Sequence, residues 1–195
     1  MNRFVLLSAL LLSPLLSLLL LPWADAQTPV QLVTGSVRYT ASDARDTWQG
    51  TAPVEQLEWQ IDLEHLPAVS LTVRINPADF NSGNLIRDAN ARRSVFETGR
   101  YPEIVLTGER FVAQSTRLQD GQSLSGTLTG TLDMHGVTQT IRMPVELTRN
   151  GERIAVESNF SVLLSDFEMT RPSFLGVTVD DEVQLTVTVV GVLAP

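Results

Sequence analysis

The chain has 195 residues, with 14 basic against 22 acidic side chains and a formal net charge of −8 at pH 7. This acidic balance argues against a general nucleic-acid-binding surface and against strong attraction to anionic lipid headgroups. Because the chain contains no cysteine, disulfides and a lipid-modified N-terminal cysteine are excluded. Stability must therefore come from a buried core, which a chain of this length can build.

The first 26 residues have the pattern of a secretory signal peptide. Arg3 gives a basic start, an apolar stretch covers residues 4–21, and Ala24-Asp25-Ala26 supplies the small residues of a cleavage site. The apolar stretch is long enough to rival a membrane anchor. Two prolines and the cleavage site favour removal, so we expect one exported domain over residues 27–195.

Apolar and polar residues alternate along most of the mature chain, which predicts half-buried strands. The expected strands lie near residue 38, at 57–63, 69–75, near 107, and at 124–134, 137–147, 154–164 and 183–189. The dipeptides Asp120-Gly121, His135-Gly136 and Asn150-Gly151 supply the positive φ angles of tight turns. The pattern therefore predicts an antiparallel meander.

The expected strands are long, and their length bears on the fold. About eight antiparallel strands with one apolar face can pack as a sandwich or close into a barrel. Several approach a dozen residues against a usual ~5–6, which favours a tall barrel with a deep interior. Gly126 and Gly130 on the apolar face either leave space for a ligand or bend a filled core. Both interpretations stay open at this point.

Residues 85–97 break the alternation and predict a short helix. We expect Asn84 to cap its N-terminus, Asp88 to pair with Arg92 one turn later, and Gly99 to end it in the left-handed conformation. The apolar face that we expect to turn towards the interior consists of Leu85, Ile86, Ala89 and Phe96.

Three stretches resemble the YceI-like, polyisoprenoid-binding family. FNSGNLIRDANARRSVFETGRYPEIVLTG, over residues 80–108, carries the Arg-Asp pair, a phenylalanine and Tyr-Pro before a strand. GTLTGTLDMHGVTQTIRMPVEL, over 126–147, carries the Gly and Leu-Thr strand with His-Gly-Val-Thr, and SDFEMTRPSFLGVTVDDEVQLTVTV, over 165–189, is a weaker match. The chain departs from the family at Leu163-Leu164, where Asn-Arg is frequent, and at Glu168, where glycine is expected.

The resemblance implies an all-β, eight-stranded antiparallel, lipocalin-like barrel in the periplasm, with one helix inserted at about residues 85–97. Its apolar bore would hold a long isoprenoid lipid of the quinone or polyprenyl type. Arg87 and Asp88 match the family signature, and we expect them to pin the helix beside the barrel and to shape the entrance. The residues expected to contact the lipid are Trp59, Ile61, Val73, Ile75, Phe80, Phe96, Phe160, Val162, Phe167 and Phe174.

Two other functions stay open. One is an interaction or stress-response module with a filled barrel, and the less favoured one is a lipid-modifying hydrolase or isomerase. The two histidines, His65 and His135, have no partner at metal-ligand spacing, and no nucleophile-elbow motif occurs. We therefore expect no catalytic residue, no metal and no cofactor other than a bound lipid such as a quinone. The expected partner is an isoprenoid or other long-chain lipid and no nucleic acid; a homodimer and a membrane-protein donor or acceptor stay open.

Overall fold

The computed structural model describes residues 27–194, apart from the side chain of Phe174. The predicted signal peptide therefore lies outside the described residues. The strands are β1 (Thr28–Ser42), β2 (Thr47–Pro53), β3 (Gln56–Ile61), β4 (Ala68–Ile75), β5 (Ile104–Ala113), β6 (Ser123–Met134), β7 (Val137–Asn150), β8 (Arg153–Leu163), β9 (Ser173–Phe174), β10 (Val177–Thr178) and β11 (Glu182–Leu193). The helical turns are η1 (Pro77–Asp79), α1 (Leu85–Asn90), η2 (Ala91–Val95) and η3 (Leu164–Phe167). Within this part of the chain, no helix has the length and apolar character needed to cross a bilayer.

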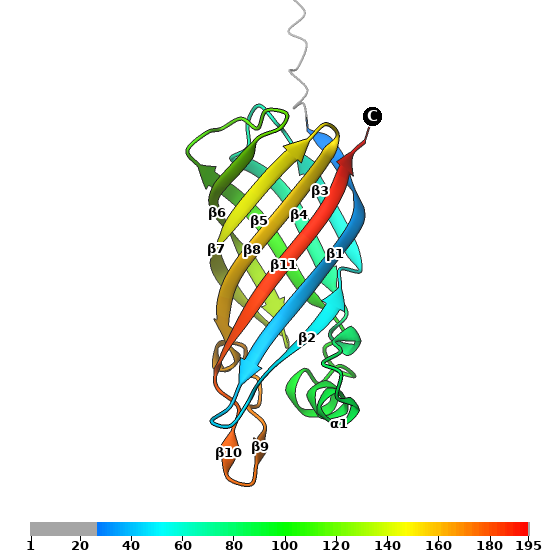
Figure 1. Ribbon diagram of the computed structural model, residues 1–195, viewed down its shortest axis with the longest axis vertical. Coiled ribbons are helices and arrows are strands. Elements are labelled where there is room, and N and C mark those ends of the chain that lie inside the picture. Colours follow the sequence, from blue (N-terminus) through cyan, green and yellow to red (C-terminus); the bar gives the residue numbers. More distant parts are fainter. Residues whose placement is uncertain (1–26, 195) are drawn as a thin grey trace, which may run out of the picture.

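Eight antiparallel strands close into a barrel, as the sequence predicted (Figure 1). The order around the barrel is β1, β3, β4, β5, β6, β7, β8 and β11, and β11 pairs back onto β1. Strand β1 closes the barrel because its two edges have different partners. One edge pairs with β11 over most of its length, while the other pairs first with β3 and then with β2.

The turns between the later strands follow the predicted chemistry. His135 and Gly136, with φ of 57° and 76°, form the two-residue connection between β6 and β7. Gly151 has φ of 62° at the β7–β8 turn. All three φ angles lie in the left-handed region that favours glycine, so this region is the expected meander. The expected tight turn at Asp120-Gly121 is instead the end of a longer loop, over residues 114–122, between β5 and β6.

The half of the barrel drawn at the top of Figure 1 is closed by loops at its end, and buried side chains fill its interior. The loops 62–67 and 114–122 meet across this end, where the Leu118 amide donates to the Leu63 carbonyl and the Leu66 amide donates to the Thr116 carbonyl, both at 2.9 Å. Leu66 and Leu118 are about 2% and 1% exposed and plug the opening. The side chains that pack this filled half include Val30, Trp59, Ile61, Phe111, Leu124, Leu128, Met143, Val145, Leu147, Ile154 and Val189.

The two glycines on the apolar face of β6 serve packing in the wall and filled core. A Cβ atom on Gly126 would lie 2.6 Å from the Phe111 ring and from the Val112 carbonyl oxygen, and one on Gly130 would meet the Thr107 carbonyl oxygen. Gly130 also faces Gly108, next to a shift in the β5–β6 register. The space beside both residues is therefore taken by β5, which favours the filled-core interpretation.

The segment between β4 and β5 forms the expected helix, and all four residues expected on its inward face border the cavity, but three of them do so from exposed positions at its mouth. Leu85 and Ile86 are 86% and 84% exposed, and Ala89 is exposed as well. The inward side carries Asp88 and Val95, with Phe96 packed against the core. The α-helical part is only six residues long and continues as a π-helical turn, so the 3.6-residue period used for the prediction does not hold along the segment.

The charges and the end of this helix also differ from the prediction. The Asn84 side chain accepts from the amides of Ile86 and Arg87, which confirms the N-cap. The expected Asp88–Arg92 pair is absent among the described residues, because Arg92 Nε instead donates to the Ala78 carbonyl at 2.7 Å. The left-handed residue at the C-terminal end is Glu97, with φ of 46°, and Gly99 does not adopt this conformation.

Candidate functional site

The other half of the barrel encloses a cavity of about 1010 Å³ that opens at the end opposite the Leu66–Leu118 plug. Its walls are almost wholly apolar and come from six of the eight barrel strands, β1, β4, β5, β6, β8 and β11, together with β2. The wall residues include Val37, Ala41, Val73, Ile75, Ile104, Leu106, Leu132, Met134, Phe160, Val162, Val183, Leu185 and Val187. We call this part the hollow half.

The mouth of the cavity lies between three elements that we call the rim: the β1–β2 turn (residues 43–46), α1, and the β9–β10 hairpin with its flanks (residues 172–179). Each contributes residues to the cavity lining. Figure 1 shows α1 and the hairpin at the same end of the barrel. The cavity therefore has one mouth, surrounded by short segments instead of a plug.

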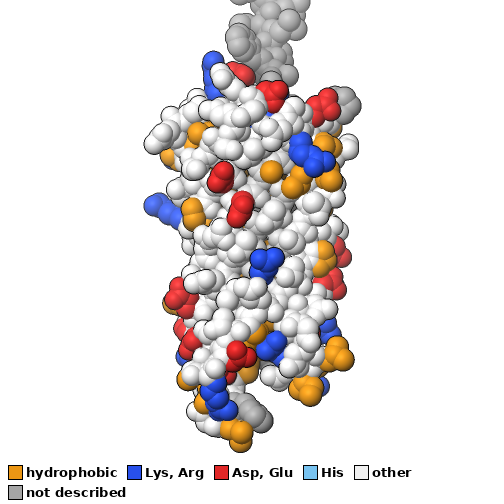
Figure 2. Space-filling model, viewed as in Figure 1, with side chains coloured by type: hydrophobic (Ala, Val, Ile, Leu, Met, Phe, Trp, Pro, Cys, Tyr) orange, Lys and Arg blue, Asp and Glu red, His pale blue; other side chains and the backbone are white. Residues whose placement is uncertain are grey.

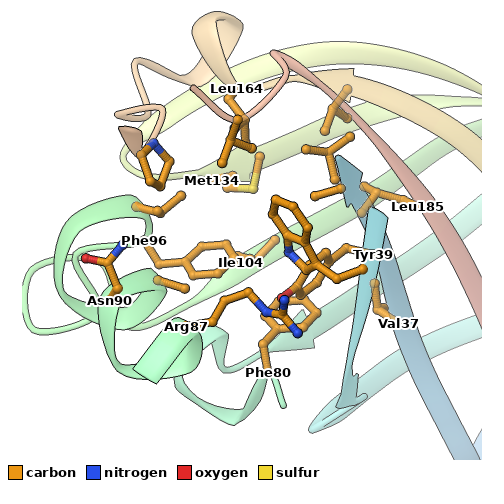
Figure 3. Close-up of a pocket in the computed structure, with 18 of the residues that line it drawn as sticks. Val37, Tyr39, Phe80, Arg87, Asn90, Phe96, Ile104, Met134, Leu164 and Leu185 are labelled. Carbon is orange, nitrogen blue, oxygen red and sulfur yellow. The ribbon is translucent and has the colours of Figure 1, made fainter. Parts of the chain in front are cut away.

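Aromatic rings gather just inside the mouth (Figure 3). The Phe80 ring stacks on Phe96, with centroids 5.4 Å apart, and meets the edge of Tyr39 at 5.3 Å. Offset and edge-on ring pairs of this kind stabilise one another beyond simple burial. The helical insert is thereby held against β1, and its Phe96 becomes part of the cavity wall.

A polar cluster lies beside these rings and centres on Ser82. The Ser82 amide and hydroxyl both donate to the Asp88 carboxylate, which is 4% exposed. Arg87 Nε donates to the Ser82 hydroxyl oxygen at 2.9 Å, and Arg87 Nη2 donates to the Ser82 carbonyl at 3.3 Å. The Arg87 guanidinium also lies over the Trp48 ring, 5.2 Å from its centroid. The buried carboxylate is thus satisfied by hydrogen bonds, and the arginine is held at the mouth.

The Tyr39 phenol faces this cluster. Burial raises the pKa of Tyr39 above its ordinary value, while the neighbouring Arg87 charge works in the opposite direction. The phenol is therefore protonated at neutral pH and can donate or accept a hydrogen bond at the mouth. Together with Arg87 it places the polar groups of the cavity near its open end (Figure 3).

The sequence motif at Ser165-Asp166-Phe167 forms most of η3, directly after the end of β8. The Ser165 amide and hydroxyl donate to the two carboxylate oxygens of Asp181, at 2.9 and 2.6 Å. These hydrogen bonds lower the pKa of Asp181 below its ordinary value. His135 contacts the Phe167 carbonyl through Nδ1 at 3.1 Å, outside the cavity. This cluster ties η3 to β11 and to the β6–β7 turn.

The structure brings together six of the ten residues expected to contact a lipid. Those that line the cavity are Val73, Ile75, Phe80, Phe96, Phe160 and Val162. Trp59 and Ile61 pack in the filled half, and Phe167 is buried under η3, so none of the three is part of the cavity wall. The Phe174 side chain lies outside what the structure describes. Contact of the six lining residues with a lipid stays a prediction, as does a shaping role for Arg87 and Asp88, which the structure places at the mouth.

Several lining residues were absent from the prediction, notably Tyr39 and Trp48. They come from β1 and β2. Their signal was available in the pattern: Val37, Tyr39 and Ala41 alternate along β1 and face inwards together. The weaker alternation near residue 38 predicted a strand, but it did not predict which face of that strand lines the cavity.

Comparison with known proteins agrees with this fold. A model of the YceI-like domain matches residues 30–191. Burkholderia cenocepacia BcnA is 18% identical, with a TM-score of 0.65 over 80% of this chain and 95% of that one. A polyisoprenoid binding domain from Saccharophagus degradans, implicated in plant cell wall breakdown, is 16% identical, with a TM-score of 0.66 over 85% of this chain and 98% of that one. The Campylobacter jejuni YCEI protein is 21% identical, with a TM-score of 0.57 over 74% and 85%. The comparison with curated proteins finds no match.

Proposed function

Because this chain belongs to the family of YceI-like domains, we propose that it binds a long isoprenoid lipid of the quinone or polyprenyl type in its cavity. The observation that carries the proposal is the single-mouthed, apolar cavity of about 1010 Å³, at the upper end of the roughly 300–1,000 Å³ range of ligand sites. The structurally similar domain from Saccharophagus degradans is described as polyisoprenoid-binding, which supports the same ligand class.

Apolar burial alone can supply the affinity. Each buried methylene contributes ~0.8 kcal/mol, so a five-carbon prenyl unit offers roughly 3–4 kcal/mol before ordering and desolvation costs. A few units would already approach the ceiling of about 18–21 kcal/mol for non-covalent complexes. The cavity therefore needs no reactive group to hold such a chain.

The position of the polar groups supports a defined orientation for the lipid. The Tyr39 phenol and the Arg87 guanidinium lie near the mouth, whereas the deeper wall is formed by residues such as Leu106, Leu132 and Val187. An isoprenoid tail matches the apolar wall, and a quinone ring or other polar headgroup matches the mouth. We infer that the tail lies deep and the headgroup lies beside Tyr39 and Arg87.

Binding, and not catalysis, is the activity we infer. The described lining residues include no histidine or cysteine, and His135 lies outside the cavity with its Nδ1 committed to the Phe167 carbonyl. At the mouth, Arg87 and the neighbouring buried Asp88 are engaged with Ser82. This arrangement offers no nucleophile activated by a neighbouring base.

We infer that the protein works in the periplasm as a carrier or store for its lipid. The support is the signal-peptide pattern of residues 1–26, with its basic start, apolar stretch and small residues before position 27. N-terminal mass analysis of protein recovered from periplasmic extracts tests this. A chain that retains residues 1–26 and fractionates with the membrane would contradict it.

The direct test of lipid binding is organic-solvent extraction of the purified protein, followed by mass spectrometry. We expect isoprenoid species in the extract, or uptake of an added isotopically labelled polyprenol by protein stripped of lipid. If repeated preparations neither carry nor take up an isoprenoid while the cavity stays open, the proposal is wrong. The matched control is Val187→Phe, which places a ring in the cavity and should reduce uptake.

A further inference from the structure

The most exposed large apolar side chains of the described residues gather around the cavity mouth. Leu85 and Ile86 on α1 are 86% and 84% exposed, and Leu175 at the tip of the β9–β10 hairpin is 79% exposed. The other exposed large apolar residues, Val33, Val112 and Leu163, are 40–50% exposed and lie separately on the strands of the barrel. Single exposed apolar residues are ordinary, but a group on the separate elements of one rim is not.

Figure 2 shows this arrangement on one face of the molecule. Hydrophobic side chains project at the lower right, over α1, and at the lower tip, over the β9–β10 hairpin. The cavity opens between these two elements, since residues of both line it. The projecting side chains and the mouth therefore point to the same side of the protein.

The leucine at the hairpin tip is largely exposed and has an unfavourable backbone conformation. Leu175 and Gly176 form the two-residue turn between β9 and β10, with φ of 50° and 77°. Turns with two positive φ angles favour Asn, Asp and Gly, and a leucine there carries a steric cost. A large apolar side chain is thus held in solvent at a position where a small polar residue would be more stable.

Arginines accompany these apolar tips. The rim carries Arg45 in the β1–β2 turn and Arg87 in α1, and two further arginines lie next to it, Arg93 in η2 and Arg171 before the hairpin. Arg45 Nη2 donates to the Leu175 carbonyl, which links the turn to the hairpin tip. Guanidinium groups suit contact with phosphate, although Arg87 donates Nε and Nη2 to Ser82 and Arg171 donates Nε to the Val179 carbonyl, so these two have only their other donors left for it.

The acidic residues of the rim are engaged in local hydrogen bonds. Asp43 accepts from the amides of Arg45 and Asp46, and Asp180 accepts from the Ser42 hydroxyl at 2.7 Å. The chain as a whole has a net charge of −8, so overall charge does not draw it to an anionic surface. Apolar insertion must therefore provide most of any attraction to a bilayer, with the arginines meeting phosphates at the same depth.

We propose that the rim docks on a phospholipid bilayer, with Leu85, Ile86 and Leu175 inserted into the interfacial region and the cavity mouth facing the lipids. Projecting tips on separate elements suit insertion into a fluid interface, because each tip can enter independently. They suit a protein partner less well, because such interfaces need a continuous, closely packed surface. The proposal goes beyond isoprenoid binding, since it can be measured on vesicles that contain no isoprenoid.

The test is co-sedimentation with vesicles of phosphatidylethanolamine and phosphatidylglycerol, using protein expressed from the full chain and recovered in its secreted form. Wild-type protein should sediment with the vesicles and should largely remain bound in high salt. The combined variant Leu85→Gln, Ile86→Gln and Leu175→Asn should bind the vesicles at least about tenfold more weakly, because three apolar side chains are lost from the interface.

Two controls separate docking from folding. Leu175→Asn places a residue suited to positive φ at the turn, so its melting temperature should equal or exceed that of the wild type while vesicle binding falls. The double variant Val33→Thr and Val112→Thr removes exposed apolar surface from the barrel wall and should bind vesicles like the wild type.

Three outcomes would overturn the proposal: no vesicle binding by the wild type, undiminished binding by the combined rim variant, or rim-dependent self-association in solution without vesicle binding. The last would make a second copy of the chain the occupant of the rim. Isoprenoid uptake in detergent is measured separately. Protein that takes up isoprenoid but ignores vesicles overturns docking alone, and protein that binds vesicles but no isoprenoid overturns the proposed function alone.

Discussion

The two halves of this barrel share most of their strands and the same alternation, yet one is packed solid and the other is hollow. On β11, Val189 is buried in the filled half, and Val187, two residues away on the same face, lines the cavity. The filled half contains Trp59, Phe111 and the leucine plug, whereas the deep wall of the hollow half is rich in valines. The comparison teaches that side-chain volume and the closure of each end, and not the strand pattern, decide where a barrel holds a ligand.

The largest expected effect is a loss of packing in the filled half. Phe111→Ala should lower the free energy of unfolding by about 3–5 kcal/mol, because the ring is 4% exposed and packs over Gly126. Phe160→Ala, on the cavity wall, should cost much less, since its ring already borders empty space. Urea denaturation of both variants measures the difference. Equal losses would show that the two halves are packed alike.

A second test adds volume to each half instead of removing it. Val189→Phe should lower the free energy of unfolding by about 1–3 kcal/mol through overpacking. Val187→Phe should leave stability unchanged, because the new ring enters the cavity, while isoprenoid uptake falls. Thermal denaturation and labelled-polyprenol uptake measure the two effects. A Val187→Phe variant as unstable as Val189→Phe would argue that the cavity is not open.

At the mouth, polar contacts replace the apolar packing of the closed end. Arg87→Ala should cost about 1 kcal/mol by removing hydrogen bonds to Ser82. It should also raise the pKa of Tyr39 further, because the Arg87 charge lowers it. Ultraviolet titration of tyrosinate in a Tyr101→Phe background follows this pKa, and Arg93→Ala serves as the matched control. An unchanged Tyr39 pKa would contradict the placement of the guanidinium beside the phenol.

The smallest expected effect concerns acid sensitivity. The pKa of Asp181 is lowered in the folded state, so its contribution to stability is present above the ordinary carboxyl pKa of about 4 and is lost as pH falls through the folded value. Hydrogen exchange at low pH should therefore rise at η3 before it rises in the loops around Leu66 and Leu118. Ser165→Ala should move the Asp181 pKa back towards its ordinary value, as measured by NMR titration. If hydrogen exchange rose at the same pH at η3 and in the loops around Leu66 and Leu118, the expected difference between the two ends of the barrel would be wrong.

The sequence predicted the barrel well because alternation reports which side chains face inwards. It could not report their height along the bore. Trp59 and Ile61 face inwards as expected, but they lie in the filled half, so they are not cavity residues. Height depends on register and on the strand tilt of the closed barrel, which arise only when distant segments pair.

The helical insert was the least predictable part of the site. A regular 3.6-residue period placed Leu85 and Ile86 inside, whereas the structure leaves both exposed at the mouth and buries Asp88. The local reason is that Ser82 supplies both its amide and its hydroxyl to that carboxylate, which makes burial of the charge tolerable. The charge pattern of the helix could not predict this arrangement, because Ser82, the partner of Asp88, precedes the helix in the chain.

The closed end of the barrel also limits the routes by which a bound molecule could enter and leave the cavity. Under the proposed function, a lipid held in this bore would enter and leave by the same end, so the protein would not act as a conduit between two membranes. The tail must enter first and leave last, and the headgroup stays at the doorway throughout. Under the proposed carrier role, the whole molecule would have to leave the donor surface, diffuse and present the same face to the acceptor.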